Sequence, residues 1–341
     1  EKQEDSVKED EASVTVEEAK ADTKLAKKEP SVIETEVDIE EELEGEEEEI
    51  GKKKKRHRYF YNFLKPCEYS CHIPFIVNWR LFLSMEKYIY RNKLRQLPLQ
   101  VDKKEFQFLQ VCNESLYWLI FAKRVVKVTN KTVMKYYLIK SYTKKNVVNW
   151  DLLKPVKHER NILKMTKFPF IGHLEFYFTD EKRIYFGFPF IAGQTLRAYL
   201  LEEIRLDEQL IKFYTTQLIL ALEYLHYLNI IFRNLKPENI LIQPNGYIKL
   251  IGFMKAKFIK CRTFTQCITL EYSAPECINR LSGYGFSVDW WALGVNIYEM
   301  GAGFSPFHCG IEEKTANRIL NGVYKMPVYF SYELKHLLKQ M

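Results

Sequence analysis

The chain has 341 residues, 47% of them hydrophobic, which is enough apolar material for one domain of two lobes with a terminal extension. Its net charge of +7 is unevenly placed, because residues 1–50 hold 21 acidic side chains against 6 lysines, a net of −15, so that residues 51–341 carry +22. The longest apolar stretch, Trp290 to Gly303, is far shorter than the roughly 20 residues of a membrane helix and contains Asn296 and Glu299, which excludes a membrane span there.

The cysteines and the N-terminus indicate a compartment. Seven irregularly spaced cysteines leave at least one thiol unpaired in any disulfide scheme. The first residues are rich in glutamate and contain no hydrophobic segment of the secretory kind. These features predict a reducing environment, and we expect a cytoplasmic location.

The first hundred residues divide into two segments. Residues 1–50 contain no aromatic side chain and form a tail that we expect to be disordered, because it cannot bury enough surface to offset its backbone entropy. Residues 51–105 begin with the basic run from Lys52 to Arg58. This run could be a nuclear-import signal, a contact to an anionic surface, a partner for the acidic tail, or simply a solvated linker. Between Phe75 and Gln96, apolar residues recur at helical spacing and predict an amphipathic helix that packs on the following domain.

Residues 106–341 then change from strand patterns to helix patterns. Alternating and β-branched residues predict strands from Phe106 to about Tyr142, followed by a helix from Val148 to Met165. Further strands are predicted over 174–178 and 183–190. A helix is predicted from Asp207, a plausible N-cap, to about Tyr227. This segregation favours an α+β fold with a small β-rich lobe over about 106–190 and a larger helical lobe over about 191–341.

Three motifs occur in a distinctive order in the second lobe. They are Phe232–Asn239 (FRNLKPEN), Ser273–Glu276 (SAPE) and Val288–Val295 (VDWWALGV). In this order and spacing they resemble protein kinases, and in detail the cyclic-AMP-dependent kinase catalytic subunit of the AGC group. The resemblance extends from about Phe106 to Met341. It implies a bilobal kinase fold that ends near its penultimate helix.

The resemblance also implies a set of chemical groups, some of which this chain lacks. Kinases position the nucleotide phosphates with a glycine-rich loop, a lysine, metal ligands and an aspartate near the acceptor hydroxyl. Here no glycine lies between Gly51 and Gly172, and the segment Leu116–Lys123 in the place of the loop is bulky and apolar. Because only glycine lets the backbone approach phosphates so closely, we expect no phosphate cradle there.

Two acidic positions of the family are neutral in this chain. Asn234 stands in place of the catalytic-loop aspartate, next to the retained Lys236, and we expect its amide to stabilise the loop and not to accept a proton. Gly252 stands in place of the metal-binding aspartate, so the carboxylate that would hold magnesium is absent. Asn239, the second metal ligand of the family, remains. One neutral amide is a poor site for a hard dication, and we expect no metal.

The nucleotide site is expected to be partly retained and partly filled. Lys140 and Glu159 match the phosphate-anchoring lysine and its helix partner, and we expect them to act as a structural clamp. Leu138 replaces a small alanine, and together with Val125 and Leu241 it is predicted to fill the adenine cavity. We therefore expect no nucleotide cofactor. The family's internal hydrophobic column is matched by four apolar residues, which are Leu163, Leu174, Phe232 and Phe253.

Regulatory and substrate-binding positions can also be matched to the family. Thr265 aligns with the activation-loop phosphothreonine, and Arg233 is a possible phosphate partner, although an ordinary exposed threonine is an equally good interpretation. Glu238 and Glu299 match acidic residues that select arginine-bearing peptides, while the third acidic position is Thr195. A basic peptide or pseudosubstrate partner follows as one hypothesis.

The sequence therefore predicts a pseudokinase that acts as a scaffold or as an allosteric or competitive regulator, with an active kinase or a regulatory or inhibitory subunit as its partner. The first alternative is a residually active Ser/Thr protein kinase that uses ATP and magnesium. The second is a basic surface-binding module for nucleic acid or anionic lipid, which the charge of +22 suggests but no recognition motif accompanies.

Overall fold

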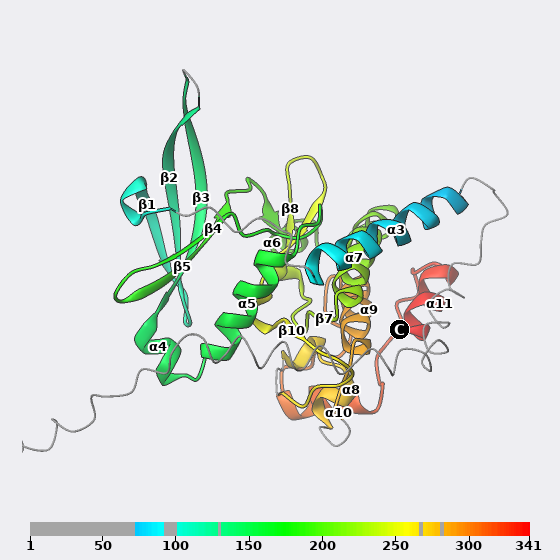
Figure 1. Ribbon diagram of the computed structural model, residues 1–341. Coiled ribbons are helices and arrows are strands. Elements are labelled where there is room, and N and C mark those ends of the chain that lie inside the picture. The colour runs from blue at the N-terminus through cyan, green and yellow to red at the C-terminus, as the bar shows by residue number, and fades with distance from the viewer. Residues whose placement is uncertain (1–71, 92–100, 129–130, 266–268, 280–282) are drawn as a thin grey trace, which may run out of the picture. The chain divides into compact units, whose positions relative to one another are not determined.

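The computed structural model describes residues 72–91, 101–128, 131–265, 269–279 and 283–341 (Figure 1). The chain divides into two units after Pro74, and apart from the first residues of the helix His72–Arg91 the features below belong to Phe75–Met341. The acidic tail over residues 1–50 and the basic run from Lys52 to Arg58 lie outside the described residues, so the expectations for them stay predictions.

A five-stranded antiparallel sheet forms the first lobe. Its strands are β1 (Phe106–Asn113), β2 (Trp118–Val128), β3 (Lys131–Thr143), β4 (Phe176–Thr179) and β5 (Arg183–Pro189), in the spatial order β1-β2-β3-β5-β4. Because side chains alternate across a strand, Tyr137 and Ile139 of β3 face the buried core of this lobe with Phe176 and Tyr185. Leu138 and Lys140 therefore point to the opposite face.

Two helices follow β3, where the sequence predicted one. They are α4 (Lys144–Asn149) and α5 (Leu153–Met165), and α5 runs beside the sheet in Figure 1. The predicted start of the helix at Val148 is wrong because Asp151 adopts a left-handed backbone conformation (φ 49°), which interrupts the helical turn. The buried face of α5 carries Val156, Glu159, Ile162 and Leu163 at helical spacing.

The second lobe is mainly helical. Its helices are α6 (Leu196–Glu203), α7 (Glu208–Tyr227), α8 (Pro275–Ile278), α9 (Ser287–Ala302), α10 (Glu312–Leu320) and α11 (Tyr332–Gln340). Short strands form the sheet β6-β8-β9, made of β6 (Gln194–Thr195), β8 (Ile240–Ile242) and β9 (Ile248–Leu250), and the pair β7 (Ile230–Ile231) with β10 (Lys257–Phe258). The 3-10 turns are η3 (Lys103–Glu105), η4 (Pro237–Asn239), η5 (Phe253–Lys255) and η6 (Leu270–Tyr272).

Helices α7 and α9 make the centre of this lobe and lie side by side (Figure 1). The side chain of Asp207 accepts hydrogen bonds from the backbone N–H groups of Gln209 and Leu210, which confirms the predicted N-cap of α7. Helix α9 is apolar on nearly all sides and is buried along most of its length, as expected for a core helix. The predicted α+β fold with a β-rich and a helical lobe is confirmed.

The helix expected between Phe75 and Gln96 is α3 (His72–Arg91), which packs on α7. The indole Nε1 of Trp79 donates to Glu223 at 2.9 Å, and the hydroxyl of Tyr224 donates to the buried Glu86 at 2.8 Å. Among the described helices, α3 included, none is both long enough and apolar enough to cross a bilayer.

Candidate functional site

A buried ion pair joins the sheet to α5. The Nζ atom of Lys140 on β3 lies 2.8 Å from Oε1 of Glu159, and the two residues are only 7% and 1% exposed. The second oxygen of Glu159 accepts a hydrogen bond of 2.6 Å from the hydroxyl of Tyr142. The predicted pairing of Lys140 with Glu159 is thus present, and both carboxylate oxygens have a donor.

Two aromatic rings enclose the same ammonium group. Nζ of Lys140 lies 4.3 Å from the ring centroid of Tyr117 and 5.1 Å from that of Tyr142, and the two rings meet edge to face. Burial, followed by the nearby Glu159, raises the pKa of Tyr142 well above its ordinary value, so this hydroxyl stays a donor. We call Lys140, Glu159, Tyr142 and Tyr117 the clamp. It leaves little of the lysine accessible to phosphate oxygens.

The turn between β1 and β2 explains why Tyr117 reaches the lysine. The backbone N–H of Glu114 donates to the carbonyl of Tyr117 at 2.9 Å and closes a tight turn without glycine. Across the sheet, Leu119 pairs with Lys140, so Tyr117 lies just beyond the strand position opposite the lysine. Sequence reasoning missed Tyr117, although an aromatic residue in place of a loop glycine was a signal that could have identified it.

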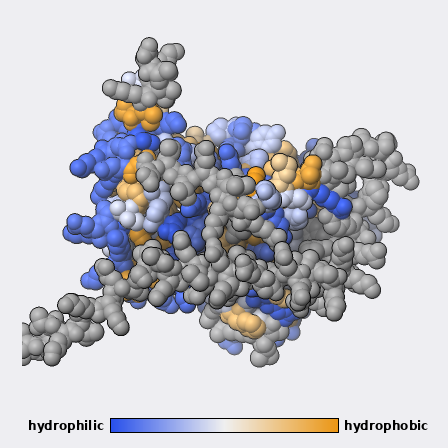
Figure 2. All heavy atoms as spheres, viewed as in Figure 1, coloured by the Kyte–Doolittle hydropathy of each residue, from blue (hydrophilic) through white to orange (hydrophobic). Residues whose placement is uncertain are grey.

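The three residues predicted to fill the adenine cavity do not share one position. Leu138 is half-buried, opposite Phe121 of β2 and Phe188 of β5, and Leu241 is half-buried on β8. Val125 lies opposite Met134, farther along the β2–β3 hairpin, and is 56% exposed. Figure 2 shows hydrophobic surface near the tip of this hairpin. The prediction for Val125 is wrong, because the strand register places Phe121 across from Leu138.

The side-chain amides of Asn234 and Asn239 donate hydrogen bonds to backbone carbonyls at the positions where the kinase family has its catalytic carboxylates. Nδ2 of Asn234 donates to the carbonyl of Gly252 at 2.8 Å, and Nδ2 of Asn239 donates to the carbonyl of Asn234 at 2.7 Å. The backbone N–H of Ile251 donates to the carbonyl of Asn239 at 2.9 Å. We call Asn234, Asn239 and Gly252 the amide cluster. Its hydrogen bonds use the amide of Asn234 as a donor, which a carboxylate cannot be.

The amide cluster does not fit a magnesium ion held as in the family. Gly252 has a left-handed backbone (φ 83°), and a Cβ added to it would lie 2.5 Å from Oδ1 of Asn239. A carboxylate at this position would therefore require Asn239 to move. In the absence of that carboxylate, the single amide oxygen of Asn239 is a poor ligand for a hard dication. Lys236 is half-buried at the start of η4 and lines a small cavity with Arg233 and Asn234.

Buried residues surround the segment Phe232–Asn239 and hold it in place. Asp289, which is fully buried, accepts hydrogen bonds from the backbone N–H groups of Phe232 and Arg233 at 2.8 and 2.7 Å. It also lies 2.8 Å from Nε2 of His226. The four residues of the predicted hydrophobic column are all buried, namely Leu163, Leu174, Phe232 and Phe253. Glu276 accepts a hydrogen bond from Ser287 at 3.0 Å.

The predicted regulatory threonine, Thr265, lies beside one basic side chain, that of Lys257. Nζ of Lys257 donates to the hydroxyl of Thr265 at 3.0 Å, and the Tyr284 hydroxyl donates to the carbonyl of Thr265. Arg233 reaches this region through Tyr284, whose hydroxyl it contacts at 3.0 Å, and not through Thr265 itself. Burial, followed by the charges of Lys257, Arg233 and Lys154, lowers the pKa of His158.

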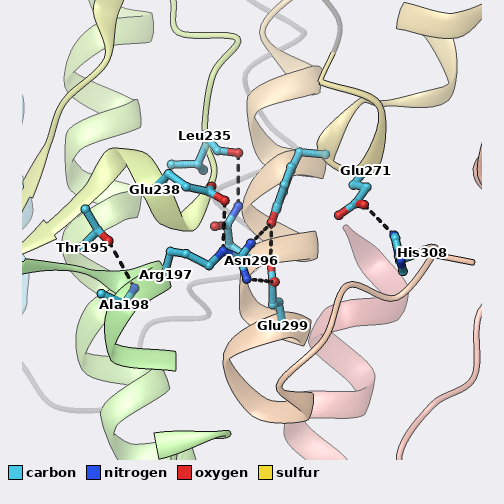
Figure 3. Close-up of polar contacts among 10 residues, drawn as sticks. Thr195, Arg197, Ala198, Leu235, Glu238, Glu271, Asn296, Glu299 and His308 are labelled. Carbon is cyan, nitrogen blue, oxygen red and sulfur yellow. Dashed lines mark hydrogen bonds and ion pairs between the residues drawn. The ribbon is translucent and has the colours of Figure 1, made fainter. Parts of the chain in front are cut away.

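The acidic pair expected to receive an arginine from a partner already holds one of this chain (Figure 3). Nε of Arg197 on α6 lies 3.0 Å from Glu238, and its Nη1 lies 2.7 Å from Glu299. Its Nη2 donates to the hydroxyl of Tyr272 at 2.6 Å. Sequence reasoning missed Arg197 and Tyr272. The structure thus pairs Glu238 and Glu299 with an arginine of the same chain, and the hypothesis of a basic peptide partner stays a prediction.

Thr195, which stands in the family's third acidic position, has a structural role. Its side chain accepts a hydrogen bond from the backbone N–H of Ala198 at 3.2 Å and caps the first turn of α6 (Figure 3). Since α6 carries Arg197 two residues later, this cap helps to hold the guanidinium in place.

The comparisons with known proteins all indicate the same family. Residues 122–341 match the protein kinase domain. The chain is 37% identical over 238 residues to a cAMP-dependent protein kinase catalytic subunit of Dictyostelium discoideum. The aligned region covers 70% of this chain and 36% of the relative. It is 38% identical to cAMP-dependent protein kinase type 3 of Saccharomyces cerevisiae, covering 61% of this chain and 52% of the relative.

A human relative shows the same relationship. The chain is 37% identical over 218 residues to the human cAMP-dependent protein kinase catalytic subunit PRKX, covering 64% of this chain and 61% of the relative. The chain thus spans between about a third and three fifths of the length of these three relatives.

Proposed function

Because this chain belongs to the protein kinase family, with AGC-type cyclic-AMP-dependent kinases among its relatives, we propose that it is a kinase-fold protein that positions or regulates other proteins without transferring phosphate. The expected partners are proteins of a phosphorylation pathway, namely an active kinase or a regulatory or inhibitory subunit. The family supplies the fold, whereas the side chains of this chain decide its chemistry.

The amide cluster carries this proposal. Phosphoryl transfer needs metal ions to neutralise the phosphates and a group that orients the acceptor hydroxyl. The side chain of Asn234 donates a hydrogen bond to the carbonyl of Gly252. Gly252 itself has no side chain, and Oδ1 of Asn239 occupies the space that a Cβ at this position would need. Neither position offers a carboxylate, so both the metal contact and the general-base contact of the family are lost.

The clamp gives independent support. In an active kinase the lysine must be able to contact phosphate, but Lys140 is 7% exposed and its Nζ lies 4.3 Å from the centroid of the Tyr117 ring. Its contacts join β3 to α5 within the chain itself. The clamp therefore holds α5 against the sheet through side chains of this chain alone.

The names of the relatives favour a second candidate, a Ser/Thr protein kinase that transfers phosphate from ATP with magnesium. The three relatives above are kinases by name, and on the comparisons alone this candidate is better supported than a silent scaffold. The clamp retains the lysine and the glutamate that such an enzyme uses. The two candidates make opposite predictions for nucleotide binding.

Thermal unfolding of the purified chain with and without ATP and magnesium separates them. A ligand at 100 times its dissociation constant stabilises the folded state by about 2.7 kcal/mol, which raises the melting temperature measurably. We expect no rise, while an active cyclic-AMP-dependent kinase in the same buffers serves as the positive control. A saturable rise that requires magnesium would contradict the proposal and support the second candidate.

A further inference from the structure

The hairpin of β2 and β3 extends past the strands on either side of it. Pairing with β1 ends at Arg124, and pairing with β5 ends at Tyr137. One further hydrogen bond on the β5 side, from the backbone N–H of Phe190 to the carbonyl of Tyr136, is 2.9 Å long. Beyond these residues the hairpin is a ribbon of two strands, which projects from the rest of the sheet in Figure 1.

The outer edge of β3 carries unpaired backbone groups in this ribbon. Because the carbonyl of Tyr136 points toward β5, the N–H and C=O groups of Met134 and Thr132 point to the same side. In the part of the chain that the structure describes, no strand lies beside them, since β5 ends at Pro189. A two-stranded ribbon is only marginally stable in water, and a third strand would satisfy these donors and acceptors.

One face of the ribbon is apolar. Met134 lies opposite Val125, and Tyr136 follows Met134 on the same face of β3. Phe190 adjoins Tyr136 at the end of β5, and these four side chains are between 42% and 58% exposed. A strand added at this edge would therefore meet apolar side chains on this face, where β-branched residues pack well.

The opposite face of the ribbon is basic. Lys135 lies opposite Arg124, which is paired with Glu105. The side chain of Lys135 is 51% exposed, and its Nζ lies as far as 4.0 Å from Glu175. The sequence from Lys123 to Tyr136 contains five basic residues and no acidic one. Since successive residues of a strand alternate between its faces, an added strand would need acidic residues on this face and β-branched residues on the other.

We propose that the open edge of β3 binds an extended segment of a partner protein in which acidic residues alternate with β-branched residues. The segment adds as a strand at Thr132 and Met134, with its apolar side chains on the face of Met134 and its carboxylates on the face of Lys135. In this mode of recognition the main-chain hydrogen bonds supply affinity and the alternating side chains supply specificity. Nucleic acid offers phosphates to the lysines, but it has no backbone amides for the edge. This inference goes beyond the proposed function, since it uses neither the clamp nor the amide cluster.

Peptide binding to the full chain, followed by calorimetry, tests the inference. The probe is an acetylated and amidated peptide with the sequence of residues 33–40, Ile-Glu-Thr-Glu-Val-Asp-Ile-Glu, which has the required alternation. We expect it to bind with an affinity that falls as the salt concentration rises. Two further peptides carry methyl groups on alternate amide nitrogens. The one whose methyl groups face the edge should bind at least about tenfold more weakly, and the other should retain its affinity.

Variants of the edge supply the matched controls. Met134→Pro removes an N–H that makes no hydrogen bond within the hairpin, and should weaken binding at least about tenfold, whereas Met134→Leu keeps the amide and should bind normally. If the proline variant is poorly folded, Lys135→Glu on the exposed basic face should also weaken binding.

Three results would overturn the inference. The first is absence of binding, and the second is binding that neither methylated peptide nor either edge variant weakens. The third is tighter binding of the free peptide by a full chain with Val37→Lys and Ile39→Lys, which would assign the edge to this chain's own segment and not to a partner protein.

Discussion

The clamp and the amide cluster differ in what each has retained of the kinase apparatus. In the clamp, the ionisable side chains of Lys140 and Glu159 are both retained, and each has a partner on another secondary-structure element. In the amide cluster, Asn234 and Gly252 have replaced carboxylates, and backbone carbonyls satisfy the amides that remain. Charges are thus preserved where they join parts of the protein and are absent where they would hold a metal ion.

This difference separates stability from chemistry. A buried ion pair contributes to a unique arrangement of sheet and helix even when no ligand is bound, whereas a carboxylate without its metal would be a buried charge with no compensation. Replacing the carboxylates therefore removes the desolvation cost of buried, unpaired charges. The neutral amides form hydrogen bonds with a much smaller desolvation cost. The ion pairs of Arg197 with Glu238 and Glu299 follow the rule of the clamp, since each of these charges also has an opposite charge beside it.

The largest effect is expected from breaking the clamp. Lys140→Ala leaves Glu159, which is 1% exposed, without its cation, and should lower the free energy of unfolding by about 3–5 kcal/mol. Urea unfolding followed by circular dichroism measures this loss. The double variant Lys140→Met with Glu159→Met should lose less than the single variant, because two apolar side chains leave no buried charge. Equal losses would show that the charge pair is not what makes the site sensitive.

A smaller effect is expected from filling the vacant position of the amide cluster. Gly252→Ala introduces a Cβ within 2.5 Å of Asn239, whereas Gly246→Ala, at a similar φ of 80°, meets nothing within 4 Å. The backbone cost is therefore shared by the two variants, and the difference in their unfolding free energies should be about 1–3 kcal/mol from overpacking. Identical losses would mean that Asn239 does not occupy the space beside Gly252.

Restoring the acid at position 234 tests the hydrogen bond of the same cluster. Asn234→Asp replaces the donor to the carbonyl of Gly252 by an acceptor, and should cost about 1–2 kcal/mol at neutral pH. The protonated carboxyl can donate again, so the loss relative to the original chain should shrink as the pH falls. Asn234→Ala, which cannot be protonated, is the matched control and should show no such pH dependence.

The smallest effect concerns His158, half-buried on α5 among positive charges. Its pKa is lowered from 6.5 by burial and then by Lys257, Arg233 and Lys154. Because the folded state disfavours the charged ring, this histidine contributes stability above pH 6.5 that is lost as the pH falls through its lower folded pKa. An NMR titration of the ring should show a midpoint below 6.5 that moves upward in Lys257→Ala. A midpoint at or above 6.5 would contradict the described surroundings.

The parts of the molecule that local patterns control could be predicted from the sequence. Asp207 precedes an amphipathic repeat and caps α7, and the order of strands and helices predicted the two lobes. The pairing of Lys140 with Glu159 followed from a resemblance carried by short motifs. The absence of glycine between Gly51 and Gly172 already showed that the β1–β2 turn is built from residues with side chains.

The rest depended on register and on contacts distant in sequence. Leu119, Phe121 and Val125 are separated by even numbers of residues and lie on one face of β2, so alternation alone cannot tell which of them is opposite Leu138. Arg197 meets Glu238 and Glu299, which are 41 and 102 residues away in sequence. No periodicity reveals such a meeting, because it is created by the packing of α6, η4 and α9 against one another.

Transfer of labelled phosphate from ATP to a peptide by the purified chain tests the central claim most directly, with Lys140→Met measured beside it. We predict that the original chain, with Asn234 and Gly252 in its loop, gives no more transfer than Lys140→Met does. Transfer above background that Lys140→Met abolishes would contradict the account and make this protein an active kinase.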